Sequence, residues 1–185
     1  DLTQLQIPTA APADQPTVTP PFSVVQMTLD DVGNYSSLSF SPDGSQILAV
    51  REDISDENPG FDLAIINIAN RTRAVLTNDR NALAESHATW SPAGNLIVYS
   101  AIAEGDETHD LYLISADGTG QPIALTNSPA DDIYPQYSPD GSYLAFSSNR
   151  AADYNIFLID MSTQQVVAQL TDRDRPVFMG SWVAP

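Results

Sequence analysis

One short pattern occurs three times along this chain and constrains its fold more than any other feature. An aromatic residue is followed by Ser-Pro-x-Gly at Phe40–Gly44, Trp90–Gly94 and Tyr137–Gly141. The copies are separated by about 50 residues, which is the length of one four-stranded structural repeat. Three copies in register predict a tandem array of equivalent units.

Each copy continues with the same order of segments. An apolar strand comes next, then a third strand, and each unit closes in Leu-Thr at 76–77, 125–126 and 170–171. The expected second strands are Ile47–Val50, Leu96–Tyr99 and Tyr143–Phe146, and the expected third strands are Asp62–Ile68, Asp110–Ser115 and Asn155–Asp160. Near-continuous Ile, Leu and Phe in the third strands predict burial on both faces, as between stacked sheets.

The Ser-Pro-x-Gly step has a mechanical reason to recur. Proline presets φ at the first turn position, Asp can bond its own backbone, and Gly accepts a positive φ. We therefore expect each copy to be a tight turn between the first two strands of its unit.

These units resemble the repeats of the TolB-like β-propeller family, which belongs to the PD40/WD40-like repeats. The match is best at 137–171, where the turn, the apolar strand, Ser148-Asn149-Arg150 and the terminal Leu-Thr follow in family order. Copies one and two carry longer acidic loops instead of Ser-Asn-Arg, and copy two has Ala93 in its turn. The resemblance covers about residues 24–183.

This resemblance implies an all-β fold built from blades of four antiparallel strands. Three complete blades are expected at about 35–77, 87–126 and 134–171, with a partial strand at each end, at about 24–28 and 178–183. Propellers usually close with four to eight blades. We therefore expect the open side to be covered by further chain, by another copy of the chain or by a partner.

The first 21 residues differ in composition from the rest of the chain. Five prolines lie between Ile7 and Pro21 among Thr, Ala and Gln, which predicts an extended linker over 1–21 ahead of a propeller segment at 22–185. Such spacers tether exported domains, so we expect an extracytoplasmic location, whether periplasmic, cell-surface or secreted. The chain has no cysteine, which excludes disulfides and thiolate chemistry.

The net charge of −17 excludes binding to a nucleic-acid backbone, because the required field is positive. In an up-and-down blade, the loops between strands two and three and those between blades lie on one face, here called the loop face. Most acidic residues fall there, Asp110 and Asp132 among them. The expected partner-binding residues are Glu52, Glu57, Glu104, Asp106, Glu107 and Trp182.

Oxygen ligands suited to Ca²⁺ occur in close pairs on the same face, namely Asp53, Asp56, Asp131, Asp132, Asp172 and Asp174. None completes a calcium-binding loop motif, so no cofactor is assigned. His87 and His109 lie too far apart in sequence for a paired zinc or iron motif. His87 is expected to pack or to cap a turn, and His109 to have a charged surface role.

No catalytic constellation is recognisable, since no nucleophile elbow and no phosphate-binding Gly-rich loop is present. The sequence favours a noncatalytic interaction or assembly module of the cell envelope. This module would bind a protein partner through the acidic face or the open blade edges. Two alternatives stay open: the accessory propeller of a prolyl-oligopeptidase-like hydrolase, and a receptor for a carbohydrate or another small ligand.

Overall fold

The computed structural model describes residues 33–54, 60–77, 86–103, 105–172 and 175–182, and it contains three antiparallel sheets of four strands each. Within every sheet the strands are neighbours in chain order, as the sequence predicted. The described residues form no helix, and therefore none long and apolar enough to cross a bilayer. The twelve strands are β1 (Gly33–Phe40), β2 (Gln46–Asp53), β3 (Gly60–Asn67), β4 (Arg73–Val75), β5 (Ser86–Trp90), β6 (Leu96–Ala101), β7 (Asp110–Ser115), β8 (Ile123–Ala124), β9 (Asp132–Tyr137), β10 (Tyr143–Ala151), β11 (Asp153–Asp160) and β12 (Gln165–Gln169).

The repeated serine closes the turn between the first two strands of every sheet. Its hydroxyl oxygen accepts the backbone N–H five residues later, at 2.9 Å from Gln46, 3.1 Å from Leu96 and 2.9 Å from Tyr143. In the first and third copies the same hydroxyl donates to the turn aspartate. Copy two has Ala93 at that position, and Ser91 donates instead to Asn95 Oδ1 at 3.1 Å. The acceptor in copy two is therefore two residues later than in the other copies, and the Ser91 hydroxyl still makes both of its hydrogen bonds within the turn.

The terminal Leu-Thr pair also has a structural role that recurs in all three sheets. Each threonine Oγ1 accepts a backbone N–H from the third strand, at 2.8 Å for Thr77, 2.9 Å for Thr126 and 2.9 Å for Thr171. These threonines follow the short fourth strands, where backbone pairing has ended. The hydroxyl thus satisfies a donor that would otherwise be left without a partner.

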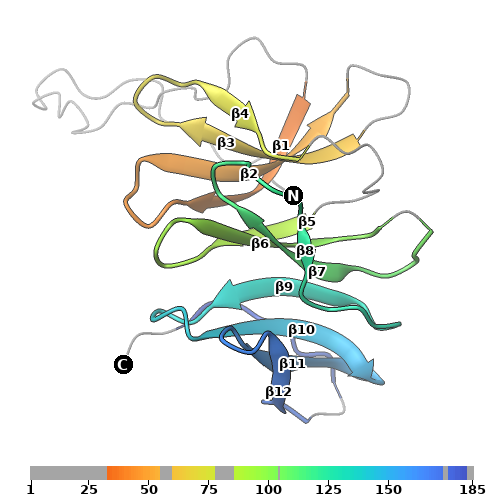
Figure 1. Cartoon of the computed structure of the whole chain (residues 1–185). Coiled ribbons are helices and arrows are strands. Elements are labelled where there is room, and N and C mark those ends of the chain that lie inside the picture. Colours follow the sequence, from red (N-terminus) through yellow and green to blue (C-terminus); the bar gives the residue numbers. More distant parts are fainter. Residues whose placement is uncertain (1–32, 55–59, 78–85, 104, 173–174, 183–185) are drawn as a thin grey trace, which may run out of the picture.

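The three sheets are stacked face to face, with the second sheet in the middle (Figure 1). One buried cluster, which includes Leu48, Leu63 and Trp90, fills the space between the first and second sheets. A second, which includes Leu111 and Phe146, fills the space between the second and third. β3 and β7 are largely buried, but Ile156 and Leu158 of β11 are only half-buried, because they lie on the face of the third sheet that contacts no other sheet. Burial on both faces was wrong for β11.

The first strands of neighbouring sheets contact one another, so they form the inner edge of the stack. Each carries a β-bulge whose residue has a positive φ: Ser37 at 53°, His87 at 45° and Tyr134 at 56°. These residues lie four positions before the repeat serine in all three copies. The bulges bring three chemically different side chains to equivalent positions along the inner edge.

The partial strand predicted at 178–183 does not form, because residues 178–182 make no ladder. A first strand is held by the second strand of its own blade, and the described residues contain no partner strand for 178–182. The segment nevertheless lies against the third sheet. Trp182 donates its indole N–H to Gln136 O at 3.1 Å, just as Trp90 donates to Ser39 O at 3.3 Å. Residues 175–182, here called the C-terminal segment, therefore occupy the place of the next inner strand.

The predicted linker at 1–21 and the predicted partial strand at 24–28 lie outside the described residues. Both stay predictions.

Candidate functional site

A small groove runs along the inner edge of the stack, where the first strands and the C-terminal segment meet. Its volume is about 230 Å³. The three bulge residues Ser37, His87 and Tyr134 line it, together with Met179 and Gly180 of the C-terminal segment. Met179 lies three residues before Trp182, the same spacing that separates His87 from Trp90. The groove is therefore built from equivalent positions of four successive units.

His87 and Tyr134 form the first part of a chain of ring contacts that starts in this groove. Their ring centroids are 3.8 Å apart, which confirms the packing role expected for His87. Burial lowers the pKa of His87, and the nearby His109 lowers it further. The imidazole is consequently neutral at pH 7.

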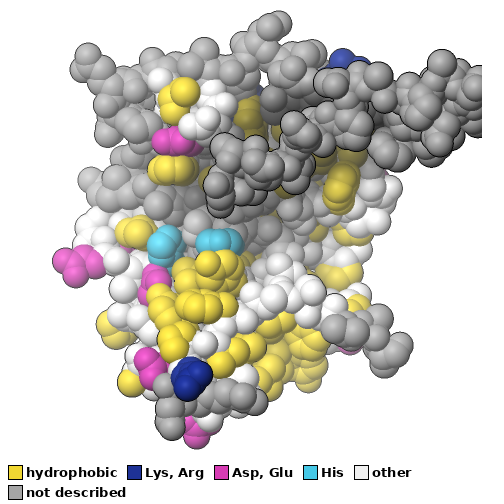
Figure 2. All heavy atoms as spheres, turned by 180° about the vertical axis from the view of Figure 1, so that it is seen from behind, with side chains coloured by type: hydrophobic (Ala, Val, Ile, Leu, Met, Phe, Trp, Pro, Cys, Tyr) yellow, Lys and Arg dark blue, Asp and Glu magenta, His cyan; other side chains and the backbone are white. Residues whose placement is uncertain are grey.

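The rings continue outward from Tyr134 through Phe178 to Tyr154. The centroid distances are 5.7 Å for Tyr134–Phe178 and 5.0 Å for Tyr154–Phe178. Phe178 is 50% exposed. We call Tyr134, Phe178 and Tyr154 the aromatic track. Figure 2 shows both histidines beside a hydrophobic patch that has acidic side chains at its border.

Asp131 lies at the outer end of the aromatic track and joins the second sheet to the third. Its Oδ1 accepts the backbone N–H of His109 at 2.9 Å and lies 2.7 Å from His109 Nδ1, while its Oδ2 accepts the hydroxyl of Tyr154. Burial alone would raise the pKa of Asp131, but the hydrogen bonds from Tyr154 and His109 outweigh it and lower the pKa. The carboxylate is thus ionised, whereas burial and the bond to Asp131 raise the pKa of Tyr154 to about 12.

Two acids expected on the exposed loop face are buried instead. Asp132 has no exposed surface and pairs with Arg150 Nη2 at 2.7 Å, while Asp110 accepts the Thr126 hydroxyl at 3.0 Å. Both begin a strand, so they lie at the loop face but beneath the loops. The guanidinium of Arg150 also lies over Phe146 and Phe157, at 5.2 and 5.1 Å from the ring centroids. The arginine of the Ser148-Asn149-Arg150 segment therefore has a structural role.

Asp110→Asn should stabilise the protein at neutral pH. Burial raises the pKa of Asp110 above its ordinary 3.8. The stability from its protonated form is fully present below pH 3.8 and is lost as pH rises through the folded-state pKa. Asn155 holds the equivalent place in the third sheet and accepts the Thr171 hydroxyl at 2.9 Å. Urea unfolding at several pH values should show that the free energy of unfolding of the variant exceeds that of wild type, by a difference that grows from pH 4 to 7. A gain independent of pH would contradict this assignment.

The remaining predicted site residues do not converge. Glu52 accepts from Asn34 Nδ2 at 2.9 Å, Asp53 pairs with Arg51 at 3.0 Å, and Asp106, Glu107 and Asp172 are exposed. Asp131 and Asp132 bind different groups, so they do not act as a pair. Asp56, Glu57, Glu104 and Asp174 lie outside the described residues. Within the described ranges no three acidic or histidine side chains are grouped as metal ligands.

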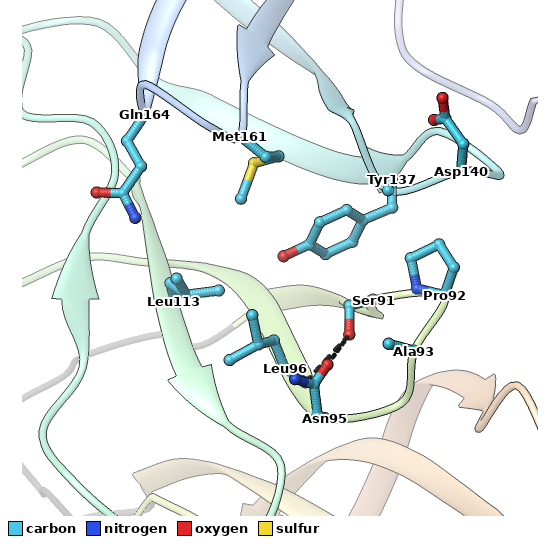
Figure 3. Close-up of a pocket in the computed structure, with 11 residues that line it drawn as sticks. Ser91, Pro92, Ala93, Asn95, Leu96, Leu113, Tyr137, Asp140, Met161 and Gln164 are labelled. Carbon is cyan, nitrogen blue, oxygen red and sulfur yellow. Dashed lines mark hydrogen bonds between the residues drawn. The ribbon is translucent and has the colours of Figure 1, made fainter.

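A second pocket of about 300 Å³ lies between the second and third sheets, on the opposite face near the turns (Figure 3). Leu96, Leu113 and Met161 form apolar walls around the ring of Tyr137. Burial raises the pKa of Tyr137 to about 12, so its hydroxyl stays neutral. The serine in the wall, Ser91, donates to an amide oxygen, which cannot act as a base. This pocket offers no activated nucleophile.

Comparison with known proteins identifies the repeats. No family model matches the chain. A TolB homologue of Chlorobium luteolum is 32% identical over 127 residues, which are 69% of this chain and 27% of that protein. The solved structure of a putative TolB from Agrobacterium tumefaciens superposes with a TM-score of 0.62 and 24% identity, covering 78% of this chain and 51% of the other. The chain is built of TolB-like β-propeller repeats.

Two further comparisons match a peptidase in sequence and a protease propeller in structure. An uncharacterized peptidase of Bacillus subtilis is 26% identical over 118 residues, 62% of this chain and 18% of the peptidase. The β-propeller domain of a Pyrococcus furiosus protease, described as having an open velcro topology, superposes with a TM-score of 0.60 at 12% identity. It covers 78% of this chain and 44% of the other. The chain thus spans about a quarter or less of its curated relatives' length.

The aromatic track of this TolB-like segment was not foreseen from the sequence. One signal could have found part of it: Tyr134 and Met179 share with His87 the position three residues before the repeat aromatic residue. Tyr154 and Phe178 belong to no repeated position among those recognised, so only the folded arrangement brings them together.

Proposed function

We propose that this segment is a noncatalytic protein-interaction module that binds a basic partner at the loop face. The observation that carries the proposal is Phe178, which is half exposed and packs against Tyr154, the residue whose hydroxyl donates to the carboxylate of Asp131. Exposed aromatic residues that are held in place are the usual anchors of protein interfaces. The net charge of −17 favours a partner of opposite charge and speeds its encounter.

The arrangement of the histidines supports a binding role over a hydrolytic one. Hydrolysis by a covalent mechanism requires a hydroxyl or thiol hydrogen-bonded to a base. Among the described residues, neither His87 nor His109 forms a hydrogen bond to a serine or threonine hydroxyl. The hydroxyls of Ser41, Ser91 and Ser138 are committed to their turns. We place the segment outside the cytoplasm, which agrees with the Pro-rich composition of residues 7–21.

Binding to a panel of short peptides tests this function. Lys/Arg-rich peptides should bind the segment, and their counterparts with Glu at the basic positions should not. The affinity should fall as salt is raised from about 50 to 300 mM, because exposed charges are screened. Fluorescence anisotropy with labelled peptides measures both effects. Equal affinity for the two peptide sets, or binding of neither, would refute the proposal.

A second candidate function is that of an accessory propeller beside the catalytic domain of a hydrolase. The similarity to the Bacillus subtilis peptidase favours it. Under this alternative the full natural protein would cleave peptide substrates, while the segment alone would only bind or admit them. Sequencing the complete reading frame and assaying its product against peptide substrates separates the two functions.

A further inference from the structure

The aromatic track presents a ring that is both exposed and held in place. The residues on either side of Phe178 donate their backbone N–H groups to the third sheet: Val177 N to Tyr154 O at 2.8 Å, and Met179 N to Ser147 Oγ at 2.6 Å. Tyr134 and Tyr154 both contact its ring. Since the ring is already ordered, a ligand stacking on it gives up little side-chain entropy on binding.

The charges around the track select among the ligands that stack on aromatic rings. Asp131 is ionised and accepts the hydroxyl of Tyr154, and Asp153, which directly precedes Tyr154 in β11, is exposed. His87, at the inner end of the track, is neutral at pH 7 because burial lowers its pKa. A positively charged group is therefore favoured over an anion at this position.

Neither of the two arginines described near the track, Arg150 and Arg175, has a cation–π contact with it. Arg150 is paired with the buried Asp132 and lies over Phe146 and Phe157, so its charge is balanced within the third sheet. Arg175 is exposed three residues before Phe178, and no cation–π contact joins an arginine to the track among the described residues. Half of the Phe178 side chain is exposed, which gives an external cation access to its ring.

We propose that the aromatic track binds an arginine side chain of the protein partner, with its guanidinium stacked on Phe178 and its charge balanced by Asp131. Arginine suits this site better than lysine because its planar group stacks on aromatic rings and is more weakly hydrated. This inference rests on the proposed function and names the chemical group that the interaction surface recognises. A carbohydrate, which also stacks on aromatic rings, is the competing ligand.

The test uses a basic peptide that binds the segment, with each arginine replaced in turn by citrulline. Citrulline keeps the shape of arginine and removes its charge. At one position this replacement should weaken binding about 2- to 30-fold, the range expected for an exposed to desolvated cation–π contact. Phe178→Leu should weaken the arginine peptide by a similar factor and leave the citrulline peptide unchanged. Phe178→Trp should preserve or strengthen binding of the arginine peptide.

Phe40→Leu is the matched control, because Phe40 is 66% exposed on β1 and lies outside the track. It should leave peptide affinity unchanged, and thermal unfolding should confirm that all three variants are folded. If the basic peptide binds wild type and Phe178→Leu equally well, the arginine site is refuted while the interaction function stands. Displacement of the peptide by maltotriose, with no effect of citrulline, would assign the track to carbohydrate and also refute the inference.

Discussion

Phe146→Ala should lower the free energy of unfolding by about 3–5 kcal/mol, the range for truncating a buried phenylalanine. Phe146 has no exposed surface and lies in the core between the second and third sheets. Its ring packs on Phe157, with centroids 6.0 Å apart, and lies beneath the guanidinium of Arg150. The substitution creates a cavity between the second and third sheets. It also removes one of the two rings over which the guanidinium of Arg150 lies. Urea denaturation followed by tryptophan fluorescence measures the loss.

Phe40→Ala provides the comparison, because it removes the same side chain from an exposed position. Its cost should stay below about 1 kcal/mol, as for most surface substitutions. If the two variants lose similar amounts, the second and third sheets are not packed through Phe146 as described.

Arg150→Met should cost about 3–5 kcal/mol, because it leaves a buried carboxylate without its ionic partner. Asp132 is fully buried, and its Oδ1 has no hydrogen-bond partner in the described structure. Within the described ranges, Oδ2 is contacted by Arg150 and by the Ser128 hydroxyl, the latter at 3.4 Å. Methionine preserves much of the apolar stem of arginine, so the loss reports mainly the missing charge.

A double variant separates the unpaired charge from a general packing defect. Arg150→Met combined with Asp132→Asn leaves no buried charge and should recover a substantial part of the lost stability. A double-mutant cycle should give a coupling energy of more than about 1 kcal/mol for two groups in direct contact. If the losses in free energy of unfolding of the two single variants simply add in the double variant, Arg150 and Asp132 do not stabilise each other.

The sequence predicted those parts of the fold that depend on local chemistry. The Ser-Pro-x-Gly turns were recognisable because proline, aspartate and glycine each act within a few residues, whereas the bond accepted by the serine hydroxyl became visible only in the structure. The terminal threonines were found as a pattern, but their bonds to the third strand became visible only in the structure. Strand order followed from the resemblance of the repeats to propeller blades, in which neighbouring strands follow one another in chain order.

The parts that could not be predicted depend on contacts between distant residues. The three bulge residues are serine, histidine and tyrosine, so no glycine in the sequence marks the positive φ at these positions. Asp110 and Asp132 were assigned to the correct face, but loop topology does not reveal depth, and both are buried. Phe178 reaches Tyr134 and Tyr154 because the C-terminal segment lies along the third sheet, bonded to it at Val177 without forming a ladder.

The most direct test of the central claim is to map where a basic peptide contacts the segment by two-dimensional NMR. Titration should shift the signals of Tyr134, Tyr154, Phe178 and His109 together, and it should leave those of Ser91, Tyr137 and Gln164 near the opposite pocket unchanged. Shifts confined to the opposite pocket, or spread evenly over the exposed acidic loops, would contradict the account.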